Sequence, residues 1–206
     1  MMDPDQLADF LSARCGKLTA SRMADAMARL KNGGEAEARK KLKIELVAER
    51  MTGDSVPHYV NDAMRWGLAT EDEAKAAFEA ETGLMLQACG TIDHPEIEYF
   101  AATPDALLSS DAVVEFKAPT TPTHVGWVLA GVVPEQHKPQ ILAQLACTGR
   151  TRAIFCSYDP RVKRGPQLFI REWEPDPAEV AAIEAAAREF LAEVDALFDQ
   201  ATMETA

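Results

Sequence analysis

Residues 103–117 read TPDALLSSDAVVEFK, and this stretch decides the fold. Its second half is apolar around a single glutamate and predicts a strand at residues 112–116. Alternate side chains of a strand share a face, so Glu115 and Lys117 point the same way. The valine and phenylalanine beside Glu115 point to the opposite face and can anchor the strand in a core. The stretch therefore predicts a sheet that holds a charged pair at its edge or in a cleft.

The first half of the stretch carries a second carboxylate, Asp105, directly after a proline. A hairpin through Ser109 and Ser110 would bring Asp105 close to Glu115. Two carboxylates held close repel each other and need a cation, and oxygen ligands favour Mg²⁺ or Mn²⁺ over zinc. Taken singly, Asp105 is equally a turn aspartate, and Glu115 with Lys117 is equally an exposed salt bridge on a strand.

A third carboxylate, Glu71, lies in a helical pattern upstream. On a helix it shares a face with Ala74 and Phe78, at spacings of three and seven. A carboxylate on an apolar stripe is costly to bury without a partner. Alone, Glu71 reads as a helix N-terminal glutamate that the helix dipole favours. Together with Asp105 and Glu115, it is predicted to be a metal ligand or a residue that orients a ligand.

Periodicity and turn signals predict an α/β fold with one mixed sheet flanked by helices. A short helix capped by Thr19 or Ser21 is expected to carry Met23, Met27 and Leu30 on one face. We expect a single domain over residues 1–206, with the amphipathic helix at 177–200 packed on its core. The other expected helices cover residues 4–13, 35–51, 62–81 and 140–147, and the expected strands cover 97–102, 112–116, 152–158 and 167–173.

The chain has 33 acidic and 21 basic residues and a formal charge of −12, which argues against a basic nucleic-acid-binding domain. The charges are unevenly spread, however. Residues 71–115 carry −10 and residues 175–206 carry −7, whereas residues 1–50 carry +2 and residues 116–174 carry +4. The acidic C-terminal helix is expected to turn its charges outward. The basic loop from Arg29 to Gly34 is either a DNA contact or simply exposed.

The N-terminus lacks the cationic leader of a signal peptide, and no apolar run approaches the roughly 20 residues that span a membrane. The four cysteines form no CxxC pair, and the four histidines lack zinc-site spacing. We therefore expect a cytoplasmic protein with reduced thiols, no membrane segment and no zinc.

Around Asp105, Glu115 and Lys117 the sequence resembles the PD-(D/E)xK nuclease superfamily. Within that superfamily it resembles the lambda exonuclease family of phage recombination nucleases. The resemblance runs from residue 14 to about residue 172. Its segments are RCGKLTAS at 14–21, Trp66-Gly67 with Glu71 and the helix up to Gly83, Pro104-Asp105, EFKAP at 115–119, the glutamines at 140–144, and YDPR at 158–161.

The resemblance implies a role for each acidic and basic residue of the predicted site. Asp105 and Glu115 would bind metal, with the backbone carbonyl of Phe116 as a further ligand. Lys117 would hold and help deprotonate the attacking water, or stabilise the pentavalent phosphate. Glu71 would complete the site.

The resemblance also implies a binding site for DNA ends, to which the helices in residues 1–60 would contribute. Arg14 and Ser21 would bind the terminal 5′ phosphate, and Thr103 stands where the family usually has a serine. Gln140 and Gln144 compete for the family's glutamine position, with Gln140 slightly favoured.

The implied activity is Mg²⁺-dependent 5′-to-3′ digestion of linear double-stranded DNA, with two ions in each active site and Mn²⁺ as a substitute. The surviving 3′ strand would pass to a single-strand annealing protein in recombination. The implied assembly is a homotrimeric ring, and the implied source is a bacterium or prophage. Two alternatives are a sequence-specific endonuclease on the same core and a catalytically inactive DNA-binding homologue. The RCGKLTAS motif argues against the first, and the intact Asp105, Glu115 and Lys117 argue against the second.

Overall fold

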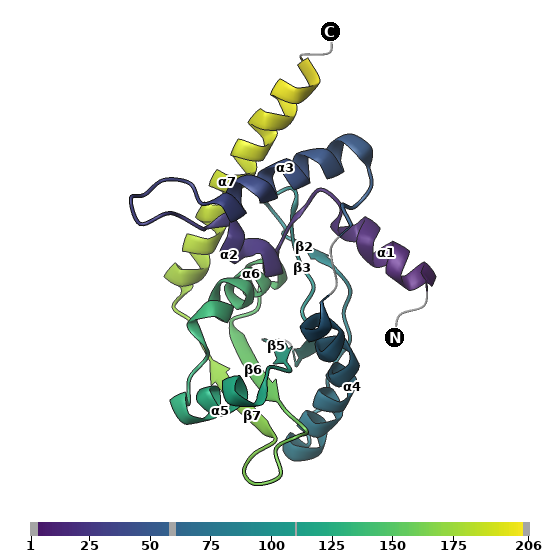
Figure 1. The fold of residues 1–206 in the computed structure, drawn as a ribbon, viewed down its shortest axis with the longest axis vertical. Coiled ribbons are helices and arrows are strands. Elements are labelled where there is room, and N and C mark those ends of the chain that lie inside the picture. Colours follow the sequence, from purple (N-terminus) through teal and green to yellow (C-terminus); the bar gives the residue numbers. More distant parts are fainter. Residues whose placement is uncertain (1–3, 58–60, 110, 204–206) are drawn as a thin grey trace.

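The computed structural model describes residues 4–57, 61–109 and 111–203 (Figure 1). Its centre is a four-stranded sheet in the order β4-β5-β6-β7, in which β5 and β6 run parallel and each outer strand runs antiparallel to its neighbour. A smaller sheet has the order β1-β3-β2. The strands are β1 (Leu18–Thr19), β2 (Ile92–Asp93), β3 (Phe100–Ala102), β4 (Ala106–Leu108), β5 (Ala112–Lys117), β6 (Arg152–Tyr158) and β7 (Leu168–Trp173).

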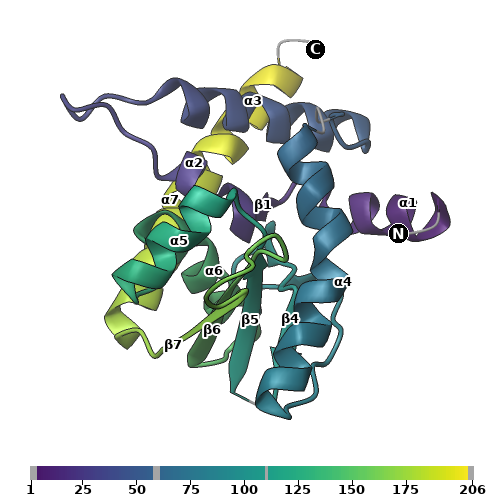
Figure 2. The ribbon, with the colours of Figure 1, turned by 60° about the horizontal axis from the view of Figure 1, so that its bottom comes forward.

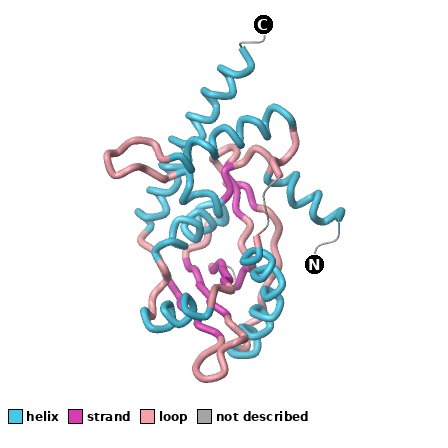
Figure 3. Tube along the Cα trace, in the orientation of Figure 1, coloured by secondary structure: helices cyan, strands magenta, loops and turns pink. Residues whose placement is uncertain are grey.

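Helices surround both sheets, as the secondary-structure colouring in Figure 3 shows. They are α1 (Pro4–Arg14), η1 (Ala20–Arg22), α2 (Met23–Ala26), α3 (Glu37–Thr52), α4 (Asp62–Thr82), α5 (Thr121–Ala130), η2 (Glu135–His137), α6 (Lys138–Thr148) and α7 (Pro177–Met203), where η marks a 3-10 helix. Within the described ranges, none of these helices is both long and apolar enough to cross a membrane.

The four-stranded sheet lies between two helical layers (Figure 2). On one face, Phe78 of α4 packs edge-on against Phe116 of β5, with ring centroids 5.9 Å apart. On the other face, Val113 belongs to a cluster that includes Ile141 of α6. Alternation along β5 therefore buries Phe116 under α4 and turns Glu115 toward α6. The predicted α/β fold, a mixed sheet flanked by helices, is confirmed.

Two predicted elements are wrong in extent. The strand expected at residues 97–102 begins only at Phe100, because the Nδ1 atom of His94 accepts hydrogen bonds from the backbone N–H groups of Glu96 and Ile97 and folds them into a turn. The hairpin partner of β5 is thus a separate strand, β4, which the sequence did not indicate. Ser110 of the expected hairpin lies outside the described residues.

The short helix after Thr19 is also wrong in extent. It ends at Ala26, and Met27 and Leu30 are 41% and 52% exposed rather than part of a buried face. Thr19 occupies the N-cap position of η1 but makes no side-chain cap bond. Its hydroxyl accepts a hydrogen bond from Arg14 instead.

The acidic C-terminal helix does not simply turn its charges to solvent, and this corrects the expectation from composition. Glu193 of α7 accepts hydrogen bonds from Arg39 at 2.5 Å and from Lys43 at 2.9 Å, both on α3. Arg29 of the basic loop pairs with Glu189 at 2.7 Å. Much of the N-terminal positive charge is therefore neutralised within the molecule.

Replacing Glu193 by glutamine is expected to lower the free energy of unfolding by about 1–3 kcal/mol. Arg39 is only 1% exposed, and Glu193 is nearer to it than its other two carboxylate partners, Glu35 and Glu189, so the substitution weakens the compensation of a buried cation. Urea titration at neutral pH measures the change. Asp199→Asn on the same helix removes an exposed charge and serves as the matched control. Equal unfolding midpoints for Glu193→Gln and wild type would contradict the role of this pair.

Candidate active site

Glu115 lies at the centre of the predicted site and is 2% exposed. Its Oε1 atom accepts a hydrogen bond from Nε2 of Gln140 at 2.6 Å and lies 2.5 Å from Nζ of Lys117. Its Oε2 atom accepts a hydrogen bond from Nε2 of Gln144 at 2.6 Å. The two glutamines lie one turn apart on α6, so both reach the same carboxylate. The sequence left Gln140 and Gln144 as alternatives for the family's single glutamine position. In the structure both donate hydrogen bonds to Glu115.

Asp105 lies in the connection between β3 and β4, opposite the same part of β5. Its Oδ2 atom accepts a hydrogen bond from the backbone N–H of Phe116 at 2.7 Å. The next residue, Ala106, pairs with Val114 across the antiparallel ladder, which places Asp105 facing Glu115. The expected approach of the two carboxylates is therefore present, although β4 rather than the strand at 97–102 provides it.

The electrostatics of the cluster show an excess of negative charge. Burial, and then repulsion from Glu115, raise the pKa of Asp105 well above its usual range. Burial alone would lower the pKa of Lys117, but the attraction of Glu115 and Asp105 outweighs it and raises that pKa. Lys117 is therefore an ammonium group near neutral pH in this arrangement.

Glu71 lies beside this cluster rather than within it. It pairs with Lys75, one turn further along α4, at 2.6 Å. It is close enough for its charge to contribute to the raised pKa values of Asp105 and Lys117. Among the described residues, its hydrogen bond is to Lys75 and not to either of those groups. Its role as a ligand or orienting residue stays a prediction.

A second cluster forms around Arg14, the last residue of α1. Its guanidinium donates to Oγ1 of Thr103 at 2.9 Å, and its other terminal nitrogen lies 3.3 Å from Oγ1 of Thr19 and 3.4 Å from Oγ of Ser21. Thr91 adds a fourth hydroxyl, 3.0 Å from that of Thr103. Sequence reasoning placed Arg14, Ser21 and Thr103 together, but it missed Thr19 and Thr91.

This hydroxyl-rich cluster lacks a counter-ion. In the part of the chain that the structure describes, no carboxylate lies within ion-pair distance of Arg14. Burial, and then repulsion from Arg22, lower the pKa of Arg14. A half-buried guanidinium among hydroxyl groups fits a phosphate, whose oxygens accept hydrogen bonds from both kinds of group.

The chain itself connects the two clusters. Thr103 touches Arg14, and Asp105, two residues later, faces Glu115. The intervening residue is Pro104, whose ring restricts the backbone φ angle between them. The Arg14 cluster and the carboxylate cluster are therefore neighbouring parts of one site.

The donor set of the carboxylate cluster fits a divalent cation. Among the described residues, no three His, Cys, Asp or Glu side chains converge as a ready-made metal site. Asp105, which is half-buried, nevertheless faces the buried Glu115, and desolvation followed by repulsion from Glu115 raises the pKa of Asp105. In addition, the Oε1 atom of Gln144 is buried without a hydrogen-bond donor. A hard cation between Asp105 and Glu115 would relieve their repulsion, and amide oxygens such as that of Gln144 belong to the same class of ligand.

A half-buried Asp105 facing a buried Glu115, with a lysine two residues further along the strand on a mixed sheet flanked by helices, defines a nuclease of the PD-(D/E)xK class. Residues 9–151 match the model of the YqaJ-like viral recombinase domain, and the chain belongs to that family. The predicted relation to the lambda exonuclease family is confirmed. Membership of this family implies a divalent metal ion.

Solved structures support the same assignment. The alkaline exonuclease LHK-Exo from Laribacter hongkongensis is 36% identical, with a TM-score of 0.88, and the match covers 96% of this chain and 97% of that one. The same figures hold for LHK-Exo in complex with dAMP. A phage-related exonuclease from Haemophilus somnus 129PT is 15% identical with a TM-score of 0.62, covering 92% of this chain and 96% of that one, and shares the fold. A search of curated proteins gave no match.

Proposed function

We propose that this nuclease digests linear double-stranded DNA from the 5′ end with Mg²⁺ and leaves a 3′ single strand. The observation that carries the proposal is the two-residue separation of Thr103 and Asp105. It joins the Arg14 cluster, whose donors suit a phosphate, to the carboxylate cluster. An end-binding pocket beside the reacting bond selects a terminus over an internal position. That arrangement supports an exonuclease over the sequence-specific endonuclease.

In this proposal the chain's own residues divide the work. Arg14, with the hydroxyls of Ser21 and Thr103, binds the terminal 5′ phosphate. Asp105 and Glu115, with the Phe116 carbonyl, hold the metal, which supplies an activated water and stabilises the leaving oxygen when it is bound.

Lys117, Glu71 and the glutamines complete the assignment. Lys117, 2.5 Å from Glu115, holds and helps deprotonate the attacking water, or stabilises the charge of the pentavalent phosphate. Gln140 and Gln144 orient Glu115. Glu71 tunes the charge of the cluster.

The ions, assembly and partners of this activity follow from the family resemblance. We propose two Mg²⁺ ions per site, replaceable by Mn²⁺, and a homotrimeric ring around the DNA, because a closed ring would keep a processive enzyme on its track. The exposed 3′ strand would pass to a single-strand annealing protein for recombination. We propose that the enzyme is bacterial or prophage-borne and acts in the cytoplasm.

A digestion assay tests this function. Linear duplex with 5′-phosphate ends is expected to release mononucleotides from its 5′ ends with Mg²⁺, more slowly with 5′-hydroxyl ends, and not at all with EDTA. Closed circular duplex is expected to stay intact. Cleavage of the circle at defined internal sites would support the endonuclease instead, and no cleavage of any DNA would favour the inactive DNA-binding homologue.

A further inference from the structure

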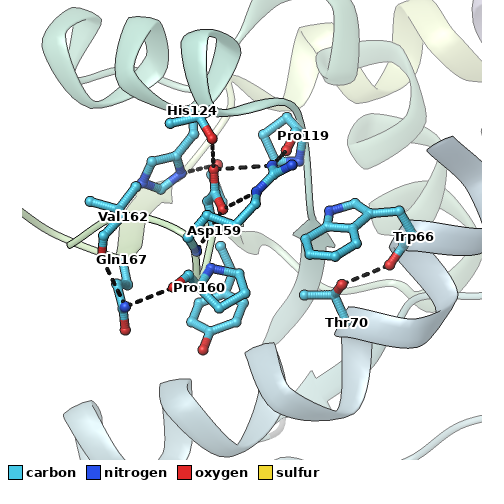
Figure 4. A network of polar contacts seen from close by, with 12 residues as sticks. Trp66, Thr70, Pro119, His124, Asp159, Pro160, Val162 and Gln167 are labelled. Atoms are coloured by element: carbon cyan, nitrogen blue, oxygen red, sulfur yellow. Dashed lines mark hydrogen bonds and ion pairs between the residues drawn. The ribbon is translucent and has the colours of Figure 1, made fainter.

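The end of β6 carries a buried, fully hydrogen-bonded carboxylate that the proposed chemistry does not use. Asp159 is 0% exposed. Its Oδ1 atom accepts from the backbone N–H and the Nε of Arg161, at 3.0 and 2.7 Å, and its Oδ2 atom accepts from the hydroxyl of Thr121 at 2.5 Å and from Nη2 of Arg161 at 3.1 Å (Figure 4). Burial would raise the pKa of Asp159, but the bonds from Arg161 and Thr121 lower it to about 2.

Arg161 extends from this carboxylate to two other elements. Its Nη2 atom donates to the carbonyl oxygen of Pro119 at 2.9 Å. Its guanidinium lies over the ring of Trp66, 4.6 Å from the centroid. Figure 4 shows Trp66 on α4 facing the network that Asp159 and Pro119 form on the other side. One arginine therefore connects α4, the end of β6 and the segment that follows β5.

These contact points lie close to the proposed active site in the sequence. Pro119 is two residues after Lys117, and Trp66 is five residues before Glu71. The residue before Asp159 adds another link, because the hydroxyl of Tyr158 donates to Glu73 at 2.9 Å. The end of β6 thus holds α4 on both sides of Glu71.

Among the described side chains of the N-terminal half of α4, Thr70 is the buried one, at 3% exposed. The core residues of this helix, Ala74 and Phe78, lie in its C-terminal half. Nearer its start, Met64 and Leu68 are 49% and 68% exposed. The contact of Trp66 with Arg161 is therefore the anchor of α4 before Glu71 that adds to the buried Thr70 and to the bond from Tyr158 to Glu73.

We propose that Asp159, Arg161 and Trp66 form a positioning clamp that fixes Glu71 on α4 relative to Lys117 on β5. The inference rests on the proposed nuclease function and adds residues that set the geometry of its site. The clamp touches neither the DNA nor the reacting atoms. Arg161 is the centre because its planar fork binds the carboxylate through two nitrogens while its face covers the indole.

The competing explanation is that Arg161 contacts the DNA backbone directly. Its side chain is 47% exposed, and it lies in a basic loop with Lys163 and Arg164. In the described residues those two neighbours make no hydrogen bond or ion pair. Arg164 is thus a matched control, with the same charge in the same loop but no part in the clamp.

The experiment measures kcat and KM for 5′-phosphorylated duplex in wild type, Arg161→Ala and Arg164→Ala. We expect kcat of Arg161→Ala to fall at least tenfold, with KM for DNA ends within twofold of wild type. Arg164→Ala is expected to keep the wild-type kcat. Arg161→Ala overturns the clamp if its kcat stays within twofold of wild type, or if only its KM rises, as a DNA contact would require.

Substitutions at Trp66 test the clamp without removing a charge. Trp66→Leu is expected to lower kcat several-fold, and Trp66→Phe, which keeps an aromatic face for Arg161, to restore most of it. Equal kcat values for the leucine and phenylalanine variants would reject the clamp. This test remains valid if the Arg161→Ala variant does not fold. A wild-type protein that digests no DNA would instead refute the proposed function.

Discussion

Lys117→Met is expected to lower the kcat of DNA digestion about 10²–10³-fold, the loss typical of removing one preorganised donor to a developing charge. The lysine has a raised pKa and lies 2.5 Å from Glu115, so it is a fixed positive charge in a carboxylate-rich site. Methionine keeps most of the length and removes the charge. Steady-state digestion of 5′-phosphorylated duplex at saturating DNA and Mg²⁺ measures the effect.

Lys138→Met is the matched control for this loss. Lys138 is the first residue of α6, 28% exposed and paired with Glu135 outside the carboxylate cluster. Its substitution is expected to leave kcat unchanged. A Lys117→Met enzyme that retains a tenth or more of the wild-type kcat would mean that the ammonium group is not part of the chemistry.

The sequence predicted β5 well because its pattern is local. Strand alternation placed Glu115 and Lys117 on one face, and their neighbours Val114 and Phe116 are buried, as expected. The strand around residue 97 failed because His94, a side chain outside the apolar run, bonds to the backbone and makes a turn. Such side-chain competition for backbone groups has no periodic signal.

The predicted site was less complete than the predicted fold for a similar reason. Arg14, Ser21 and Thr103 came from a motif resemblance, whereas Thr91 joins them only because β2 and β3 pair. The clamp was visible in the sequence as YDPR and Trp66-Gly67 but had no assigned partner, since the two segments meet only in the folded chain. Contacts between residues far apart in the chain produce no local pattern in a single sequence.

The net charge of −12 shows the same limit. Composition argued against a nucleic-acid partner, whereas counting by segment found net positive charge in residues 1–50 and 116–174. Neither count shows which charges are available to a ligand. In the structure Arg29, Arg39 and Lys43 are paired with glutamates of α7. Arg14 differs, as a half-buried cation with no carboxylate at ion-pair distance in the described part of the chain. A few unpaired cations in the right place are sufficient to bind a phosphate on an acidic protein.

Arg14→Ala is therefore expected to remove the preference for 5′-phosphorylated ends. A hydrogen bond to a charged group contributes about 1.5–3 kcal/mol, so the ratio of kcat/KM for 5′-phosphate over 5′-hydroxyl duplex should fall about 10–100-fold. The ratio isolates the contact, because any general damage to the enzyme lowers digestion of both ends alike. Arg14 donates to Thr103, and the variant therefore also requires a thermal unfolding measurement to show that the fold is kept.

Arg22→Ala separates a phosphate contact from a general loss of positive charge. Arg22 lies close enough to lower the pKa of Arg14, but its guanidinium is held by Glu45 at 2.7 Å. Its substitution is expected to keep the discrimination between the two ends. If Arg14→Ala and Arg22→Ala reduce the ratio equally, the field of the N-terminal region rather than a specific pocket recognises the end. If neither changes it, the hydroxyl cluster around Thr103 does not bind the 5′ phosphate, and the direction of digestion must be set elsewhere.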